Sequence, residues 1–361
     1  ADQFYSSLSP ISVQVTVVDS DTRVLVVSSR NLTVAEGGPH AWLQVLPSSQ
    51  PADGTNISVL ARATQALSPG AELRDEVLIN GSDTALFSFS HWNWAQPVLL
   101  EVSAIDDLWL DGTSSVSIEL NVLAESFVLF ENASTTVAVT VLDDESRAVV
   151  SDLPSAVSLS ESGASSLLYN LSLAARPFGA VTVTPSVSGS SHASVSPSEL
   201  VFDWSSWNSS ASFTFAIAPN DVDDADESYT VELTHALTSV SDSLWNSDGS
   251  SVLSSSVSVV DDDVAGLVLS ASTLTVVEGA SPTTLTIQLQ SAPTSPVVVG
   301  VVVEQGTLDA VALSSTPTAA GAALSTSTSF NFTSADWNVA RAVYVVAVDD
   351  NVVNGLQNAT L

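Results

Sequence analysis

Carboxylates gather directly after alternating apolar segments at several places in the chain. Residues 143–145 (Asp-Asp-Glu) and 261–263 (Asp-Asp-Asp) each end such a segment, and residues 106–107 (Asp-Asp) follow another. Calcium takes about six to eight oxygen ligands, often several of them carboxylates. Without an ion, carboxylates held this closely repel one another, and their pKa values rise. The clusters therefore predict calcium sites; the alternative is that they are solvated acidic loops.

The clusters belong to a repeat, because three short signatures recur in a fixed order. They are a strand ending in Glu-Gly or a close match, a Trp followed by a strand and an acidic loop, and an alternating strand ending in acids. The first is found at 32–37, 157–161 and 274–279, the second at 94–107, 207–221 and 337–350, and the third at 15–21, 139–145 and 257–263. Glu36 and Glu161 are 125 positions apart, and Glu161 and Glu278 are 117 apart. Agreement on one period indicates tandem domains.

The period predicts domain boundaries near residues 21, 145 and 263. Residues 1–21 are then the last strand of a preceding repeat, and residues 22–145 and 146–263 are two whole repeats. Residues 264–361 form a repeat without its closing strand. The simplest interpretation is a window on a longer repeat protein. Alternatively, residues 1–21 complete the open repeat of the next molecule by adding a strand to its sheet.

Short alternating segments indicate the elements that position the acids. Alternation implies strands with one face in a core and one in water, and Ser, Gly, Pro and Asp separate the segments. The clearest are 11–18, 116–122, 137–142, 212–218, 229–233 and 285–289. About seven short strands in roughly 120 residues are typical of a β-sandwich. We therefore predict an all-β rod of tandem antiparallel, immunoglobulin-like sandwiches, with the acidic loops at one pole of each.

The ordered set of signatures resembles the Calx-beta domain. The order is strand-Glu-Gly, Phe-x-Phe before a Trp, an alternating strand into Asp-Asp, and an alternating strand into an acidic triplet. That domain is known from the regulatory region of sodium–calcium exchangers and from repeated extracellular adhesion proteins. Residues 335–340 (Ala-Asp-Trp-Asn-Val-Ala) resemble the tandem Calx-beta-like repeats of microbial and algal surface proteins. The resemblance covers nearly the whole chain.

The resemblance implies calcium ligands at one end of each sandwich. In the first whole repeat they are Glu36, Asp83, Asp106, Asp107, Asp111, Asp143, Asp144 and Glu145, where Asp83 matches the family's Gly-x-Asp. In the second they are Glu161, Asp221, Asp224, Glu227, Asp261, Asp262 and Asp263, with Asn220 replacing one acid of the pair. In the third they are Glu278, Asp349 and Asp350, with Asn354 where an acid is usual. Because each triplet ends a repeat just before the next strand, an ion there would clamp the joint between neighbours.

Charge and composition exclude several partners and leave Ca2+ as the expected cofactor. Forty carboxylates face seven cations, giving a net charge of −33. A nucleic-acid surface needs Lys and Arg to displace counterions, and an anionic membrane repels such a chain in the same way. The longest apolar stretches, such as residues 297–303, are too short to span a membrane. There is no Cys, so no disulfide holds the loops.

Glycosylation sequons indicate a secreted protein. Eight Asn residues precede x-Ser/Thr, namely Asn31, Asn56, Asn80, Asn132, Asn170, Asn208, Asn331 and Asn358. Asn-x-Ser/Thr is the acceptor for N-linked glycans, which are bulky, solubilising and superficial. This number favours an extracellular glycoprotein, on the cell or the flagellar surface.

Catalysis has little support in the sequence, and we predict that the chain is not an enzyme. His40, His91, His192 and His235 fall at unrelated positions of the repeat, and no Gly-x-Ser-x-Gly motif or Cys nucleophile is present. Paired acids can hydrolyse glycosides, but a glycosidase needs one unique pair, whereas these pairs recur in each domain.

Three functions from different classes remain open. The first is a structural subunit of an extracellular filament, such as a flagellar hair (mastigoneme) or a cell-wall fibre, with other copies or repeats and other surface glycoproteins as partners. The second is the stalk of a cell-surface adhesin, and the third is a calcium-sensing regulatory module.

Trp94, Trp207 and Trp337 share one repeat phase, so a structural role is expected. Trp42 and Trp245 are out of register and are candidates for contacts between chains.

Overall fold

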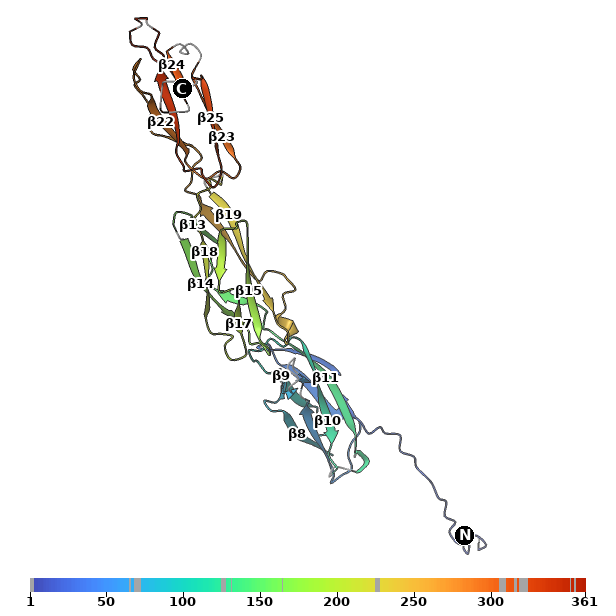
Figure 1. Cartoon of the computed structure of the whole chain (residues 1–361). Coiled ribbons are helices and arrows are strands. Elements are labelled where there is room, and N and C mark those ends of the chain that lie inside the picture. Colours follow the sequence, from blue (N-terminus) through green and yellow to red (C-terminus); the bar gives the residue numbers. More distant parts are fainter. Residues whose placement is uncertain are drawn as a thin grey trace.

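Strands dominate the chain, and the computed structural model places them in three β-sandwiches arranged end to end (Figure 1). The structure describes residues 3–64, 66–67, 73–124, 128–130, 132–163, 165–224, 228–304, 310–314, 317, 324–350, 352–353 and 355–361. Among these residues, helix is limited to two short 3-10 turns, η1 (Val128–Phe130) and η2 (Ser243–Trp245). No helix in this described part is long and apolar enough to cross a membrane. The prediction of tandem antiparallel β-sandwiches is confirmed.

The first sandwich consists of a four-stranded and a five-stranded sheet. The first sheet has the order β1 (Leu25–Val27), β3 (Ala41–Pro47), β9 (Val98–Ala104), β7 (Val77–Ile79). The second has the order β2 (Asn31–Ala35), β11 (Ser134–Leu142), β10 (Ser114–Val122), β4 (Asn56–Ala63), β8 (Thr84–Ser90). A small ribbon pairs β5 (Ala66–Leu67) with β6 (Leu73–Arg74). All pairs are antiparallel except β2 with β11, so the carboxyl ends of these two strands lie at the same edge.

The second sandwich repeats this topology strand for strand. Its four-stranded sheet has the order β12 (Val149–Ser151), β14 (Ser165–Leu173), β18 (Ala211–Ile217), β16 (Ala193–Ser196). Its five-stranded sheet has the order β13 (Ala156–Ser160), β20 (Leu253–Val260), β19 (Ser228–Thr238), β15 (Val181–Ser188), β17 (Leu200–Phe202). The pair of β13 with β20 is again the parallel one.

The third sandwich has a four-stranded sheet of the same topology as the other two and part of the equivalent second sheet. The four-stranded sheet has the order β21 (Leu267–Leu269), β22 (Thr283–Leu289), β26 (Arg341–Ala347), β24 (Val311–Ser314). Within the described residues, β23 (Val297–Val302) and β25 (Ser327–Phe332) pair as the second sheet. They take the positions that β15 and β17 hold in the second sandwich.

Period-two alternation gives each sandwich its core. Strand β10, for example, points Val116, Ile118 and Leu120 inward, and all three side chains are buried. Each such Val, Leu or Ile contributes about 1.5–3 kcal/mol relative to an exposed one. The polar residues between them face water, which fixes the register because a slip of one residue would expose the whole apolar set.

One predicted strand, over residues 11–18, has no partner strand among the described residues of this chain. Residues 11–18 alternate as clearly as β11 does, yet they form no sheet, and the N-terminal segment trails away from the first sandwich (Figure 1). Ile11 and Val13 are 91% and 80% exposed. An alternating segment becomes a stable strand only when neighbouring strands satisfy its backbone and a second layer covers its apolar side.

The tryptophans that share one repeat position behave as predicted, whereas one of the others does not. Trp94 and Trp207 are partly buried against the first and second cores, in agreement with a structural role. The interpretation of Trp245 as a contact between chains was wrong, because its side chain is fully buried in the second core. It was missed because it lies on η2, a 3-10 turn between β19 and β20, just as η1 lies between β10 and β11, and such a turn gives no alternating pattern. Trp42 is 56% exposed on β3.

The second sandwich should lose stability in acid because of one buried histidine. His235 is almost fully buried, with Nε2 2.7 Å from the Tyr169 hydroxyl and Nδ1 3.3 Å from the Leu253 carbonyl oxygen. Burial lowers the pKa of His235 below its ordinary value of 6.5. The unfolded chain therefore takes up the proton first, and the stability present above pH 6.5 is lost as the pH falls toward the lowered pKa.

Urea unfolding at about pH 7 and about pH 5 measures this loss. The double variant Tyr169→Phe/His235→Leu replaces the hydrogen-bonded pair by apolar side chains. It should show less of the acid loss than the unmodified chain. An equal loss in both proteins would show that another group is responsible.

Candidate metal centres

The ends of four strands bring the predicted ligands of the first repeat to one end of the first sandwich. Glu36 follows β2, and its backbone N–H donates to the Leu142 carbonyl at 3.0 Å, at the end of β11. Residues 106–107 follow β9, and Asp111 precedes β10. We call this set the first acidic pole; its members are Glu36, Glu76, Asp106, Asp107, Asp111, Asp143, Asp144 and Glu145. The parallel pairing of β2 with β11 makes the meeting of Glu36 with residues 143–145 unavoidable.

Backbone amides hold Asp143 at the centre of this pole. Its Oδ2 accepts N–H bonds from Asp111 at 3.0 Å and Gly112 at 2.5 Å, and its Oδ1 accepts one from Glu145 at 2.7 Å. These bonds orient the carboxylate before any ion arrives, since a short loop fixes each donor. Preorganised ligands need less reordering on binding.

Glu36 is shared by two groups of three carboxylates. Oxygens of Glu36, Asp111 and Asp143 lie within 4.8 Å of one another, and so do oxygens of Glu36, Asp144 and Glu145. The Glu36 side chain is only 5% exposed. Two cation positions on either side of one buried carboxylate fit this arrangement.

Two oxygens of the pole lack hydrogen-bond partners. Within the described residues, Asp111 Oδ1 and Glu145 Oε2 are buried without any donor. A buried acceptor left unsatisfied costs about 1–3 kcal/mol, and more when it is charged. A bound cation would satisfy both oxygens, which makes them the strongest local indication of a metal site.

The pKa values record the same crowding. Burial raises the pKa of Glu36 from 4.5 to about 8, and the charges of Asp107 and Asp111 add to the rise. Burial also raises the pKa of Asp111 to about 7, together with the charges of Glu76 and Asp143. Burial raises the pKa of Glu145 to about 8, with further contributions from Asp143 and Asp144. These three acids of the pole therefore keep their protons up to a higher pH than ordinary carboxyl groups, and a bound divalent ion would displace those protons.

Glycine is required beside Glu36. Gly37 has φ +58, and a Cβ built there would lie 3.4 Å from Asp144 Oδ2 and 3.7 Å from Asp106 Oδ2. A side chain at this position would be strained by the left-handed backbone, although its Cβ would meet both carboxylates only at ordinary contact distances. The Glu-Gly signature is thus explained by the backbone conformation after Glu36.

Glu76 is a member of the pole that the sequence analysis missed. It precedes β7 and is 6% exposed, and its Oε2 accepts from the Ser114 hydroxyl at 3.4 Å. Burial and the charge of Asp107 raise its pKa. Asp83, which was predicted instead, is exposed in the β7–β8 turn, accepts from Ser82, and lies outside both groups of three. The Gly-Ser-Asp motif therefore pointed to Asp83, which follows β7, whereas the acid that joins the pole, Glu76, precedes β7.

Among the described residues, the second acidic pole has the same backbone frame but fewer carboxylates around its buried Glu. Glu161 N–H donates to the Val260 carbonyl, Asp224 N–H donates to Asp261 Oδ2 at 2.8 Å, and Asp263 N–H donates to Asp261 Oδ1 at 2.9 Å. Asp261, Asp262 and Asp263 form a group within 4.8 Å. Burial raises the pKa of Glu161, with the charges of Asp224 and Asp261, and burial also raises that of Asp263. Glu227 lies outside the described residues.

Matching the hydrogen bonds shows which acids the second pole lacks. Val222 N–H bonds to Asn220 Oδ1 at 2.6 Å as Trp109 N–H bonds to Asp107 Oδ1 at 2.7 Å, so Asn220 takes the place of Asp107. The preceding Pro219 then takes the place of Asp106. The Asn220 amide donates to Glu161. Asp221 is therefore equivalent to Leu108, and the predicted match of Asn220 and Asp221 with Asp106 and Asp107 was out of register by one residue.

A histidine stands where Glu76 stands in the first pole. Ala218 N–H donates to the His192 carbonyl as Ile105 N–H donates to the Glu76 carbonyl. Protonated His192 would lower the pKa of Glu161, and Asn220 lowers it too. The Asn220 amide and a protonated His192 thus offset part of the negative charge of the second pole.

The third acidic pole is the most open of the three. Glu278, Asp349 and Asp350 are all exposed. A Cβ on Gly279 would lie 4.0 Å from Asp349 Oδ2, and in the first pole the equivalent Gly37 faces Asp106. The glycine and the acid are therefore placed alike in these two poles. Asn354 lies outside the described residues. Among the residues that the structure describes here, no group of three acids approaches within 4.8 Å.

The sequon asparagines lie mostly on the surface. Seven of the eight are exposed, and Asn170 is half-buried. Asn170 Nδ2 donates to Asp152 Oδ2 at 2.8 Å, and its Oδ1 accepts from Ser212 at 2.7 Å. The other sequons therefore offer more accessible acceptors than Asn170.

Comparisons with known proteins find only distant similarities. No family model and no curated protein matches the sequence. Among solved structures, CBD12 of CALX1.2 is similar at 14% identity and TM-score 0.26, covering 65% of this chain and 99% of that chain. The calcium binding domain CBD12 of CALX1.1 has 15% identity and TM-score 0.27, covering 59% and 80%. Titin domains z1z2 in complex with telethonin have 11% identity and TM-score 0.27, covering 68% and 100%. Scores this low carry no functional conclusion.

The ion-free first sandwich should lose stability as the pH rises. Glu36, Asp111 and Glu145 ionise less readily in the folded chain, with pKa values of about 7 to 8, than in the unfolded chain, where they titrate near 4. The unfolded state therefore releases protons first, so stability falls between about pH 4 and pH 8. Hydrogen exchange of β9–β11 peptides in chelator, corrected for intrinsic rates, measures this.

Glu36→Gln should flatten the decline, because it removes one of the shifted groups. Asp83→Asn serves as the matched control and should leave it unchanged. Protection that stays constant or increases with pH in chelator would contradict the crowding of charge at this pole.

Proposed function

We propose that the chain is a calcium-binding, non-enzymatic segment of an extracellular structural glycoprotein built from Calx-beta-like repeats. The observation that carries the calcium assignment is the first acidic pole. Two groups of three carboxylates share the buried Glu36, and the pole contains two buried oxygens without donors. Such a site is costly without a cation and stable with one.

The ligand chemistry favours calcium over other metals. The first pole offers carboxylate oxygens from eight residues and no sulfur, which does not suit zinc or copper. Calcium accepts about six to eight oxygens in flexible geometry, whereas magnesium keeps several waters and demands a near-ideal octahedron. A crowded arrangement of carboxylates on four loops suits the larger, more tolerant ion.

The three poles should differ in affinity. Asn220, Pro219 and His192 replace Asp107, Asp106 and Glu76 in the second pole, and the third pole is exposed. Because calcium affinity follows the number of charged ligands and the rigidity of the site, we rank the first pole above the second and the second above the third.

The proposed repeat boundaries remain residues 22–145, 146–263 and 264–361, with residues 1–21 as the last strand of a preceding repeat. Asp21 N–H donates to Asp19 Oδ1 at 3.0 Å, a two-residue bond that also forms at Asp143 and Asp261 and at Asp107 and Asp350. The assignment of residues 19–21 as a closing acidic triplet is therefore supported by their place directly after an alternating segment and not by this bond.

A structural role in a filament, such as a flagellar hair or cell-wall fibre, is our preferred biological context. The end-to-end sandwiches (Figure 1) and the recurrence of acids at the same end of each suit a scaffold better than a single catalytic site. Seven exposed sequons suit a secreted glycoprotein, and repeats or copies of the same protein are the natural partners. An adhesin stalk shares all these features and differs in carrying a binding tip.

Calcium titration by isothermal calorimetry tests the assignment. Asp143→Asn should weaken the tightest site at least about tenfold, because it removes a charged ligand while keeping an acceptor for the loop amides. Asp83→Asn, which removes an exposed carboxylate of the same repeat, should leave that site unchanged. Equal effects of the two variants, or no calcium binding at millimolar ion, would refute the site.

Small-angle scattering tests the structural role. Since the second acidic pole lies at the end of one sandwich beside the next, chelator should shorten the maximum dimension of the particle, and added calcium should restore it. Magnesium at equal concentration serves as the control and should restore it less. Identical profiles with calcium and with chelator would count against an ion-stiffened rod.

A further inference from the structure

Neighbouring sandwiches meet through the same backbone contact at both joints. At the first joint, Arg176 N–H donates to the Leu108 carbonyl at 2.6 Å. At the second joint, Ala292 N–H donates to the Asp221 carbonyl, also at 2.6 Å. The loop after β9 or β18 thus docks on the turn after β14 or β22 in each case. The first joint has a further backbone bond, from the Leu110 N–H to the Arg176 carbonyl at 3.1 Å, and the side chains of the two joints also differ.

The first joint is held by an aromatic and arginine stack. The Trp109 ring stacks on Phe178 with centroids 4.4 Å apart and planes at 19°. The guanidinium groups of Arg74 and Arg176 lie 4.2 Å and 4.4 Å from the centre of the same ring. Arg176 Nε also donates to the Trp204 carbonyl at 2.9 Å. Stacked and cation–π contacts of this kind are strengthened when they are shielded from water.

Apolar contacts extend the first joint on both sides of the stack. Leu110, from the first repeat, is 7% exposed and belongs to the core of the second sandwich. A Cβ built on Gly112 would touch the Leu244 side chain at 3.6 Å. Arg147, in the segment between β11 and β12 that connects the two sandwiches, donates to the Asn246 carbonyl. The contacts of Leu110 and Leu244 involve no oxygen of the first acidic pole, whereas Arg74 of the stack also pairs with that pole, its Nη1 lying 3.4 Å from Asp107 Oδ2.

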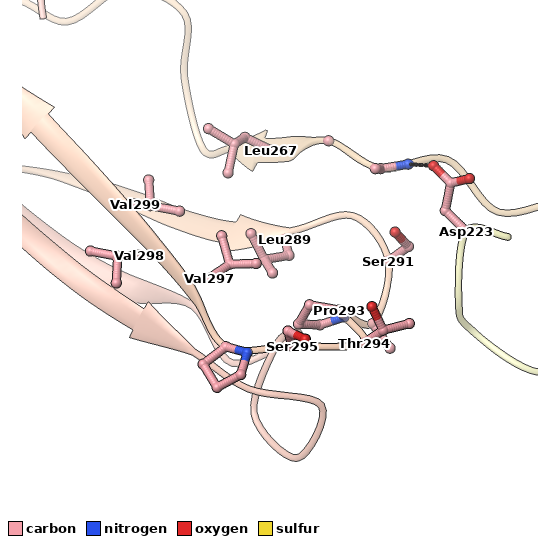
Figure 2. A pocket seen from close by; sticks show the side chains of 14 residues that line it. Asp223, Leu267, Leu289, Ser291, Pro293, Thr294, Ser295, Val297, Val298 and Val299 are labelled. Carbon is pink, nitrogen blue, oxygen red and sulfur yellow. Dashed lines mark hydrogen bonds between the residues drawn. The ribbon is translucent and has the colours of Figure 1, made fainter. Parts of the chain in front are cut away.

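The second joint has smaller or charged residues at the equivalent positions. Val222 replaces Trp109, Ala292 replaces Arg176, and Thr294 replaces Phe178. Asp223 replaces Leu110, and its Oδ2 accepts from the Ala265 N–H at 2.5 Å. Figure 2 shows Asp223 at one end of an open groove of about 770 Å³, with Leu267 exposed along it.

We infer that the rod has one fixed joint and one bending joint. The first joint keeps its geometry without a divalent ion, because aromatic and apolar contacts hold it. The second joint, held by backbone bonds and small side chains, is where the chain bends. Domains connected by a small polar interface move relative to each other by default, and a large apolar interface suppresses this. The inference does not depend on the proposed function, because it concerns the ion-free protein.

Spin-label distances in chelator test the inference, and the cysteine-free chain allows labels at chosen sites. Ser88, Ser166 and Ser329 are exposed, one on each sandwich. The 166–329 distance distribution should be at least about twofold broader than the 88–166 distribution. Equal widths, or a broader distribution across the first joint, would overturn the inference.

Two variants test whether the stack is the cause. Trp109→Ala should broaden the 88–166 distribution to the width seen across the second joint. Trp92→Ala, which removes a Trp that is 85% exposed and remote from the stack, is the matched control and should not change it. The triple variant Val222→Trp/Ala292→Arg/Thr294→Phe should narrow the 166–329 distribution by about half. A folded triple variant whose width is unchanged, or a Trp109→Ala chain that stays narrow, would contradict the assigned cause.

Discussion

Repulsion between carboxylates that the fold forces together is the constraint on which the rest of the structure depends. The parallel pairing of β2 with β11 sets Glu36 beside residues 143–145, and the ends of β9 and β10 add Asp107 and Asp111. Glu36 cannot move away from residues 143–145 without breaking the pairing of β2 with β11. The charge must therefore be neutralised by protons, as the raised pKa values of about 7 to 8 record, or by a cation.

The same backbone frame serves three poles with different chemistry. Loop amides hold Asp143 and Asp261 in the same way, so the frame exists before any ion binds. Side chains then decide how much charge the frame carries. The first pole concentrates it around Glu36, while Asn220 and His192 relieve it around Glu161. The joints vary in the same way, because the large Trp109 side chain of the first joint is replaced by the smaller Val222 at the second.

Much of this was predictable from sequence, because alternation and acidic segment ends are local signals. Glu76 was missed because its role depends on β7 pairing with β9, which no short motif encodes. Asp83 was chosen because a motif was matched without its strand context. The place of Asn220 had a readable signal: Asp107, Asn220 and Asp350 each lie 13 positions after their repeat's Trp. Residues 11–18 carry a strand pattern, but pairing needs a neighbour that sequence alone does not supply.

The most direct test of the account is an anomalous difference map from crystals of the chain grown with calcium. The account predicts a peak within coordination distance, about 2.3–2.6 Å, of carboxylate oxygens of Glu36, Asp111 and Asp143. A second peak is expected beside Asp144 and Glu145. A fully ordered first pole without either peak at millimolar calcium would contradict the claim that a divalent ion compensates these charges.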